Sequence, residues 1–246
     1  DSYAFRIGKG THSALERFDE FKRKASPRRF PNSGHILKAD IKNYYPSVDH
    51  NILLRTLKEK IADEKIIKLI EKILSICPGD KGIAVGSPCS QLFANIYLNK
   101  LDYFVKHNLR KKFYLRYCDD FVVLDRSYRE LADSRKKIED FLKDRLKLQL
   151  HPQKTKYLRT NQGVDLLGFK VFYFHRLVRR KNHRAFRRNL NLWQEEYGKG
   201  SLSASKLGER IRGWISYAEH GNSYNLRKRL LAGFTFRKNY QRPKQI

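Results

Sequence analysis

The sequence predicts a mixed α+β protein, and two kinds of segment support this prediction. Short apolar runs rich in aromatic and β-branched residues, such as residues 113–124, are typical of β-strands. Longer segments between them, such as residues 131–148, carry apolar residues at helical spacing. The chain has 246 residues, 40% of them hydrophobic, which is enough to bury a sizeable core. We therefore expect a globular protein of one large or two modest domains.

The elements of the first third can be placed in order. Residues 1–37 are basic and rich in turn residues, with one predicted helix over residues 13–24. A short strand follows and ends in Asp40. Asp49 and Asp63 then precede two amphipathic segments as predicted helix N-caps. We expect the first of these helices to bury Leu53, Leu57 and Ile61. The second is expected to bury Ile66, Ile70 and either Ile73 or Leu74.

The remaining elements alternate between helix and strand and then become helical. After a loop at residues 78–82, a helix is expected to begin near Pro88 and to turn Leu92, Ile96 and Phe104 inward. Asp119-Asp120 forms the predicted turn of a β-hairpin. A helix over residues 131–148 and strands over residues 156–160 and 164–174, joined by an Asn-Gln-Gly turn, come next. From residue 175 the chain predicts a small basic helical domain, with basic clusters continuing at residues 227–229 and at Arg237-Lys238.

The charge of the chain is strongly positive. Lys and Arg number 53 against 25 Asp and Glu, which gives a formal net charge of +28 and an isoelectric point near 10.1. Such an excess opposes compaction, and its commonest use is to bind the phosphates of a nucleic acid. A membrane surface is the weaker alternative, since no apolar run is long enough to span a bilayer. Cys77, Cys89 and Cys118 lack the spacing of a zinc site or a disulfide framework.

Three acids stand out because they interrupt apolar strands. Asp40 ends one strand, and Asp119 and Asp120 lie at the predicted hairpin turn. In a basic chain, carboxylates at strand ends indicate a divalent cation such as Mg²⁺, which prefers oxygen ligands. Two such ions about 3.5–4 Å apart would suit phosphoryl transfer on nucleotides. The alternative, that these acids are ordinary solvated turn residues, stays open on the pattern alone.

Two motifs resemble those of a known family. Asp40-Ile-Lys-Asn-Tyr-Tyr45 and Tyr117-Cys-Asp-Asp120 resemble the first and third palm motifs of reverse transcriptases, and a Gly-x-x-x-Ser-Gln helix start lies between them. The resemblance implies a right-hand polymerase fold with fingers, an antiparallel-sheet palm and a helical thumb. It implies fingers in residues 1–37, incomplete at the N-terminus, and a palm in residues 38–174 with a fingers insertion around residues 50–80. Residues 175–246 would form the basic helical thumb.

The resemblance also implies roles for individual residues. It makes Asp40, Asp119, Asp120 and the Ile41 carbonyl ligands of two Mg²⁺ ions, for which Mn²⁺ could substitute. Lys154 matches a lysine near the leaving pyrophosphate, acting as a general acid or as a charge, and the alternative is a solvated lysine. The residues implied to contact the nucleotide are Arg6, Lys9, Ile41, Tyr45, Val85, Gly86, Ser90 and Gln91. The thumb residues implied to contact nucleic acid are Arg176, Arg179, Arg180, Lys181, Arg184, Arg187 and Arg188.

Tyr45 and residues 85–91 narrow the implied function. Tyr45 matches the aromatic that excludes a ribose 2′-hydroxyl, although a packed core aromatic would look the same. Residues 85–91 read Val-Gly-Ser-Pro-Cys-Ser-Gln, whereas group II intron proteins typically read Gln-Gly-x-x-x-Ser-Pro. Together with residues 2–12, 92–102 and 216–227, they resemble diversity-generating retroelement reverse transcriptases. We expect Val85 to remove a polar contact near the incoming nucleotide and to loosen base selection.

This subtype implies an enzyme that copies a template RNA into cDNA with errors at template adenines, for mutagenic retrohoming. The implied partners are the template RNA, the RNA/cDNA duplex, dNTPs and a small basic oligomeric accessory protein, with no membrane. The implied location is the cytoplasm, in a bacterial, archaeal or phage-encoded system. The alternatives are a group II intron, retron or CRISPR-associated reverse transcriptase and a non-catalytic RNA-binding subunit. An RNA-directed RNA polymerase is a further alternative, which Tyr45 disfavours.

Overall fold

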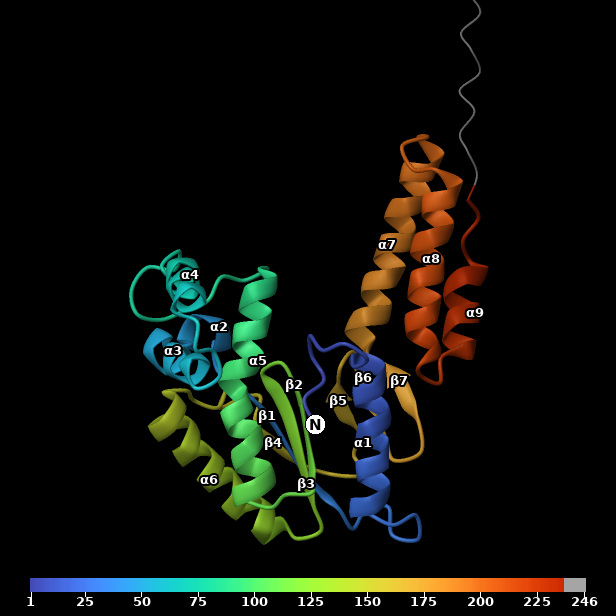
Figure 1. Ribbon diagram of the computed structural model, residues 1–246. Helices are drawn as coiled ribbons and strands as arrows, with labels where there is room; N and C mark the ends of the chain where they lie inside the picture. Colours follow the sequence, from blue (N-terminus) through green and yellow to red (C-terminus); the bar gives the residue numbers. More distant parts are fainter. Residues whose placement is uncertain (237–246) are drawn as a thin grey trace, which may run out of the picture. The chain divides into compact units, whose positions relative to one another are not determined.

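The computed structural model describes residues 1–236, which form two compact units that divide between Gln162 and Gly163 (Figure 1). The first unit, Asp1–Gln162, combines a sheet with helices, and the second begins at Gly163 with a smaller sheet and continues with helices. Arg237 and Lys238 lie outside the described residues. The predicted α+β class is confirmed.

The first unit is organised around a four-stranded antiparallel sheet in the order β2-β3-β1-β4. Its strands are β1 (His35–Asp40), β2 (Phe113–Tyr117), β3 (Asp120–Asp125) and β4 (Lys156–Arg159). Because side chains alternate along a strand, each strand sends one set of residues to each face. Helix α1 (Thr11–Ala25) covers one face, and α5 (Pro88–Tyr103) and α6 (Tyr128–Leu146) cover the other (Figure 1).

Short helices fill the segment between β1 and α5. They are α2 (Tyr44–Ser47), α3 (His50–Lys58) and α4 (Glu64–Leu74), and a π-helical turn, η1 (Phe104–Asn108), extends α5. The predicted N-caps are confirmed, because the side chain of Asp49 accepts from the Ile52 N–H and that of Asp63 accepts from the Lys65 N–H. Pro88 is the first residue of α5, as predicted.

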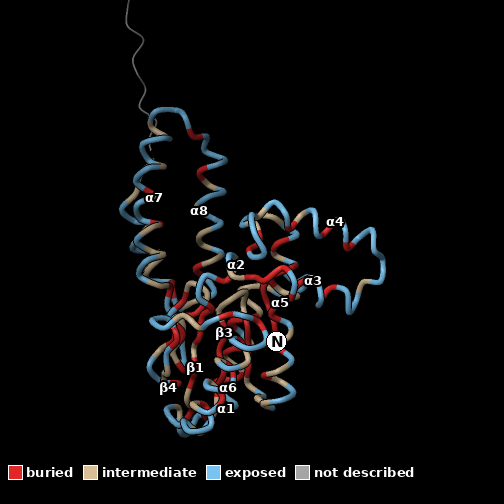
Figure 2. The backbone as a smooth tube through the Cα atoms, turned by 90° about the vertical axis from the view of Figure 1, so that its left-hand side faces the viewer, coloured by how far each residue is buried: buried red, intermediate tan, exposed pale blue. Residues whose placement is uncertain are grey.

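The main core lies between the sheet and helices α3, α5 and α6. Leu37 and Phe121 from the sheet meet Tyr97 and Leu101 of α5 there, and Figure 2 shows the buried stretch of the backbone. Burying each such side chain stabilises the fold by about 1.5–3 kcal/mol.

Two predicted buried positions are wrong by one residue. Leu92 is 57% exposed and Ile66 is 44% exposed, and their neighbours Phe93 and Ile67 are buried instead. In α5 the buried set is Phe93, Ala94, Tyr97, Leu98 and Leu101. In both segments apolar residues occupy more than one side of the helix, so apolar spacing alone did not determine which side faces the core.

The second unit starts with a three-stranded antiparallel sheet, β5 (Val164–Leu166), β6 (Phe169–Val171) and β7 (Arg176–Val178). The predicted single strand over residues 164–174 is therefore wrong, because Leu167 and Gly168 adopt positive φ angles of 48° and 90° and reverse the chain. The basic segment begins as strand β7, which pairs with β6. The second unit begins at Gly163, before the basic segment.

Three helices complete the second unit: α7 (Arg180–Gly198), α8 (Ala204–Glu219) and α9 (Tyr224–Ala232). The rings of Phe186 on α7 and Trp214 on α8 stack with centroids 3.7 Å apart. The Tyr217 hydroxyl of α8 donates to the Gly168 carbonyl at 2.9 Å, and a Cβ at that glycine would clash with the same hydroxyl. Within residues 1–236, no helix has both the length and the apolarity to cross a membrane.

Candidate active site

The turn of the β2–β3 hairpin consists of Cys118 and Asp119. The last pair of the two strands is Tyr117 with Asp120, so Asp120 is the first residue of β3 and not part of the turn. Cys118 has a φ of 56°, a left-handed conformation that a two-residue hairpin loop commonly requires. The prediction of an Asp-Asp turn is therefore displaced by one residue.

This register places Asp120 directly opposite Asp40, the last residue of β1. Asp40 is only 7% exposed. Like charges at directly opposite positions destabilise an antiparallel pair, so this end of the sheet is unfavourable without a cation. Two lysines supply part of the compensation. Lys154 Nζ lies 3.1 Å from both carboxylate oxygens of Asp40, and Lys38 Nζ lies 3.7 Å from Asp120 Oδ1.

Two lysines face three carboxylates here, so the lysines do not fully neutralise the acids. Burial and then the Asp40 carboxylate raise the pKa of Asp119. Burial also raises the pKa of Asp120, where the attraction of Lys38 opposes the repulsion of Asp40 and Asp119. The folded chain therefore disfavours the ionised form of these two carboxyls, and a bound cation would relieve this.

Backbone hydrogen bonds fix these acids relative to one another. The Ile41 N–H donates to the Asp119 carbonyl at 3.3 Å, and the His151 N–H donates to the Asp40 carbonyl at 2.7 Å. The first bond ties the hairpin turn to the end of β1, and the second ties in the loop that carries Lys154. The structure therefore brings together Asp40, Asp119, Asp120 and Lys154. The role of the Ile41 carbonyl as a ligand stays a prediction.

The donor chemistry at this sheet end fits a hard divalent cation. Carboxylate oxygens are preferred by Mg²⁺ and Mn²⁺, and Asp120 Oδ1 is buried without a hydrogen-bond donor. Within residues 1–236, no three His, Cys, Asp or Glu side chains form a ready-made metal cluster. Mg²⁺ usually binds through one or two carboxylates together with substrate phosphates, so the residues fit an ion that arrives with a nucleotide.

Tyr45 lies beside the hairpin turn. Partial burial and then the neighbouring Cys118 and Asp119 raise its pKa to about 12. The preceding Tyr44 is a core residue instead, because its hydroxyl donates to the Ala94 carbonyl of α5 at 2.6 Å. Of the two adjacent tyrosines, Tyr45 is thus the one near the acids.

Residues 85–91, which contain the Gly-x-x-x-Ser-Gln motif, lie around the start of α5. Val85 is 84% exposed, and Gly86 has a φ of 93°, which favours glycine. Ser90 is buried and Gln91 is half-buried within the first turns of the helix. Ser90 and Gln91 belong to α5, whose Ala94 carbonyl accepts from the Tyr44 hydroxyl, whereas Val85 and Gly86 precede the helix. The contacts of all four residues with a nucleotide stay predictions.

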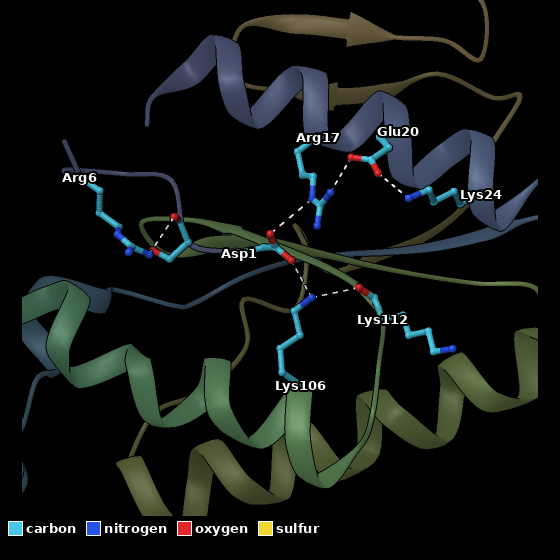
Figure 3. Close-up of polar contacts among 8 residues, drawn as sticks. Asp1, Arg6, Arg17, Glu20, Lys24, Lys106 and Lys112 are labelled. Carbon is cyan, nitrogen blue, oxygen red and sulfur yellow. Dashed lines mark hydrogen bonds and ion pairs between the residues drawn. The ribbon is translucent and has the colours of Figure 1, made fainter. Parts of the chain in front are cut away.

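A cluster of cations lies in the N-terminal segment. The pKa of Lys9 is lowered by burial and then by the charges of Arg6 and Arg17, which therefore lie close to it. The Thr11 and Tyr117 hydroxyls are 3.3 Å apart, which connects the start of α1 to the residue preceding the hairpin turn. Figure 3 shows Arg6 and Arg17 in this region, with Arg6 donating to the Ser2 carbonyl. Arg17 is itself paired with Asp1 and Glu20, so Arg6 and Lys9 are the members of this cluster that suit an anionic ligand.

The basic residues predicted for the thumb divide into two groups. Arg176 lies in β7, and Arg179 forms an ion pair with Asp165 at 3.5 Å, so both take part in local structure. The other five are exposed on α7, where positions four, seven and eight residues apart share one side of the helix. This α7 basic stripe consists of Arg180, Lys181, Arg184, Arg187 and Arg188.

Sequence reasoning missed four residues that contact these groups. Lys38 precedes Asp40 by two positions in a strand, so alternation would have placed it on the same face. Arg116 donates to the Cys118 carbonyl of the turn and forms a buried ion pair with Asp102 at 2.6 Å, and both residues lie in apolar segments that carry no periodic signal for such a pair. Thr11 looks like an ordinary residue at a helix start.

The chain matches the model of the family "Reverse transcriptase (RNA-dependent DNA polymerase)" over residues 1–171. It is 24% identical to the protein YkfC of Escherichia coli, with 87% of this chain and 65% of that protein covered. It is 23% identical to the group II intron-encoded protein LtrA of Lactococcus lactis, with 69% and 39% covered. The chain thus spans less than two thirds of the length of these curated relatives.

Among solved structures, the fold is similar to that of two telomerases. The telomerase of Candida tropicalis in complex with a telomeric RNA fragment gives a TM-score of 0.57 at 14% identity, with 93% of this chain and 44% of that chain covered. The telomerase of Candida albicans gives 0.55 at 12% identity, with 94% and 50% covered. The sheet, the paired acids and the family match agree, and the chain belongs to the reverse transcriptase family.

Proposed function

We propose that this chain catalyses RNA-templated addition of dNTPs to the 3′-hydroxyl of a primer. The observation that carries the proposal is the pairing of Asp40 with Asp120 next to Asp119 and Lys154, at a sheet end that needs a cation. Polymerisation of this kind needs positioning and charge stabilisation more than covalent chemistry.

The residues divide this work among them. Asp40, Asp119 and Asp120 would hold two Mg²⁺ ions, which lower the pKa of the primer hydroxyl and neutralise the triphosphate when bound. Tyr45, which lies near Asp119, would exclude a ribose 2′-hydroxyl with its aromatic ring. Lys154, which donates to Asp40, would give a charge or a proton to the leaving pyrophosphate, and Arg6 and Lys9 would bind the triphosphate.

Primer extension tests this function. The protein is incubated with a primed RNA template, dNTPs and Mg²⁺, and product lengths are measured for the wild type and for Asp119→Ala. We expect the substitution to lower kcat by at least about 1,000-fold, since several kcal/mol of charge stabilisation are lost. Asp133→Asn is the matched control, because Asp133 is an α6 residue that pairs only with Lys137 among the ion pairs of the described residues. Equal activity of Asp119→Ala and the wild type would refute the metal assignment.

We further propose that the enzyme belongs to the diversity-generating type and makes errors mostly opposite template adenines. The support is the sequence of residues 85–91 and the exposure of Val85, which leaves its side chain available to a substrate. A group II intron function is the second candidate, favoured by the similarity to LtrA. A small basic accessory protein and a cytoplasmic location go with the diversity-generating type, and both stay predictions.

Sequencing of the cDNA separates the two candidates. We expect a high rate of substitution opposite adenines from the wild type and a lower rate from Val85→Gln, which restores a polar side chain. An unchanged error spectrum in Val85→Gln would remove the role of Val85. Accurate copying by the wild type, with and without a candidate accessory protein, would favour the intron type.

A further inference from the structure

Arg116 of β2 is buried next to the hairpin turn and has all of its guanidinium nitrogens engaged. Its side chain is 1% exposed. Nε and Nη2 donate to the two oxygens of Asp102 on α5 at 2.7 and 2.6 Å, which is a bidentate ion pair. Nη1 donates to Asn95 Oδ1 at 3.2 Å and to the Cys118 carbonyl at 2.9 Å. A buried arginine is costly unless it is paired in this way.

The bond to Cys118 holds the backbone next to Asp119. The Cys118 carbonyl belongs to the peptide group that precedes Asp119, and Arg116 Nη1 holds it. The carbonyl of Asp119 belongs to the following peptide group, and the Ile41 N–H holds that one. Both peptide planes around Asp119 are therefore fixed. The left-handed conformation of Cys118, which is unfavourable for a residue other than glycine, needs such outside support.

The same arginine also anchors the N-terminal segment. Its backbone N–H donates to the Asp1 carbonyl at 3.0 Å, and its carbonyl accepts from the Tyr3 N–H at 3.0 Å. Asn95 Nδ2 adds a bond to the Ala4 carbonyl at 2.8 Å. In Figure 3 the Asp1 carboxylate lies between Arg17 of α1 and Lys106 of η1, which hold this segment in place.

We propose that Arg116, held by Asp102, is a positioning residue that orients Asp119 for the reaction through the Cys118 carbonyl. The inference rests on the proposed polymerase function. Arg116 does not touch the substrate in this scheme. Its effect is to keep the Asp119 carboxylate directed toward the side of the sheet where Asp40 ends.

Three variants separate positioning from simple stability. In Arg116→Lys the charge facing Asp102 is kept, but one ammonium cannot reproduce the fork that also reaches Cys118. In Arg116→Met/Asp102→Leu/Tyr114→Phe the whole polar group becomes apolar, and such replacements of a buried ion pair usually fold. Tyr114→Phe alone is the control, because its hydroxyl donates to Asp102 at 2.6 Å but does not contact the turn.

The variants are compared with the wild type by primer extension and by hydrogen exchange. We expect Arg116→Lys and the triple variant to lower kcat by about 10- to 100-fold, as misplacement by about 1 Å does, with KM for dNTPs within about twofold. Amide exchange of Ile41, whose N–H is bonded to Asp119, should become faster in both. Tyr114→Phe should retain kcat and the exchange rate of Ile41.

The outcomes are distinguishable. Unchanged Ile41 exchange in both arginine variants would overturn the positioning role, and so would faster exchange with unchanged kcat. A loss of kcat in Tyr114→Phe equal to that in Arg116→Lys would show a general effect on folding, and would also overturn it. If the wild type itself does not extend a primer, the proposed function fails, whereas activity in the wild type and in Arg116→Lys alike defeats only this inference.

Discussion

At the scale of single residues, the two adjacent tyrosines show how neighbouring identical side chains take different tasks. Tyr44 is buried and donates to the Ala94 carbonyl, whereas Tyr45 is partly exposed beside Cys118 and Asp119. The difference arises because consecutive residues at the start of α2 point about 100° apart around the helix axis.

A pair of variants tests this division. Tyr45→Ala should increase incorporation of ribonucleotides relative to deoxynucleotides, since the ring beside Asp119 is removed. Tyr44→Phe should leave sugar selection unchanged and should lower the free energy of unfolding by about 1 kcal/mol, through the loss of one buried hydrogen bond. Competition between dNTPs and NTPs in primer extension and urea unfolding measure the two effects. A change in sugar selection in Tyr44→Phe alone would contradict the assignment.

The acids could be predicted from the sequence because they stand in short motifs, and the motifs gave their identity without their geometry. The pairing of Asp120 with Asp40 depends on the strand register, and the left-handed conformation of Cys118 in the turn is part of that register. A cysteine at this position does not predict a left-handed conformation. Arg116 and Asp102 could not be predicted as a pair, because they lie on different elements, β2 and α5, and neither segment indicates that the two side chains meet.

At the scale of elements, the N-cap of α3 couples the helix to α6. Asp49 is fully buried, accepts from the Ile52 N–H at 3.0 Å and pairs with Lys147 Nζ at 2.7 Å. Burial alone would raise the pKa of Asp49, but Lys147 and the Ile52 N–H hold it below its usual value. Because the folded-state pKa is depressed, the charge stabilises the fold above the unfolded pKa of about 3.9, and this stability is lost as the pH falls through the folded pKa.

We therefore expect Asp49→Asn to lower the free energy of unfolding at pH 7 by about 1 kcal/mol, a modest value because Lys147 is half exposed and screened. The difference from the wild type should shrink as the pH falls below about 4. Urea unfolding at pH 7 and below pH 4 measures the free energy of unfolding of both proteins. Asp63→Asn is the control, because Asp63 caps α4 through the backbone N–H groups of Lys65 and Ile66 and not through a lysine ammonium, and asparagine caps about as well. A deficit in Asp49→Asn that does not depend on pH would contradict the role of the charge.

At the scale of the whole molecule, some of the excess cations are paired with acids and others are exposed and available to a ligand. Composition predicts a nucleic-acid partner but does not say which cations are available to it. In the described residues, Arg179 is paired with Asp165, whereas the α7 basic stripe is exposed. The helices of the second unit could be predicted from the sequence, but the division of residues 164–178 into three strands could not, because strands of three residues are too short to show alternation.

Salt dependence of binding to an RNA/DNA duplex tests the stripe. The logarithm of the binding constant should fall steeply with the logarithm of salt concentration. Arg187→Gln should reduce that slope by about one, as expected for one lost phosphate contact. Arg179→Gln should leave the slope nearly unchanged, since its guanidinium faces Asp165. Fluorescence anisotropy at several salt concentrations measures the slopes, and equal slopes for Arg187→Gln and the wild type would exclude this contact.

The opposed carboxylates of Asp40 and Asp120 also make thermal melting a reporter of ligand binding. A cation that binds between them relieves a repulsion present in the folded state and absent in the unfolded chain, so it raises the melting temperature by mass action. A titration of Mn²⁺ followed by melting curves, with and without a dNTP, should therefore give the affinity of this sheet end for the ion. Asp40→Asn should melt higher than the wild type in the presence of a chelator and should respond less to the ion.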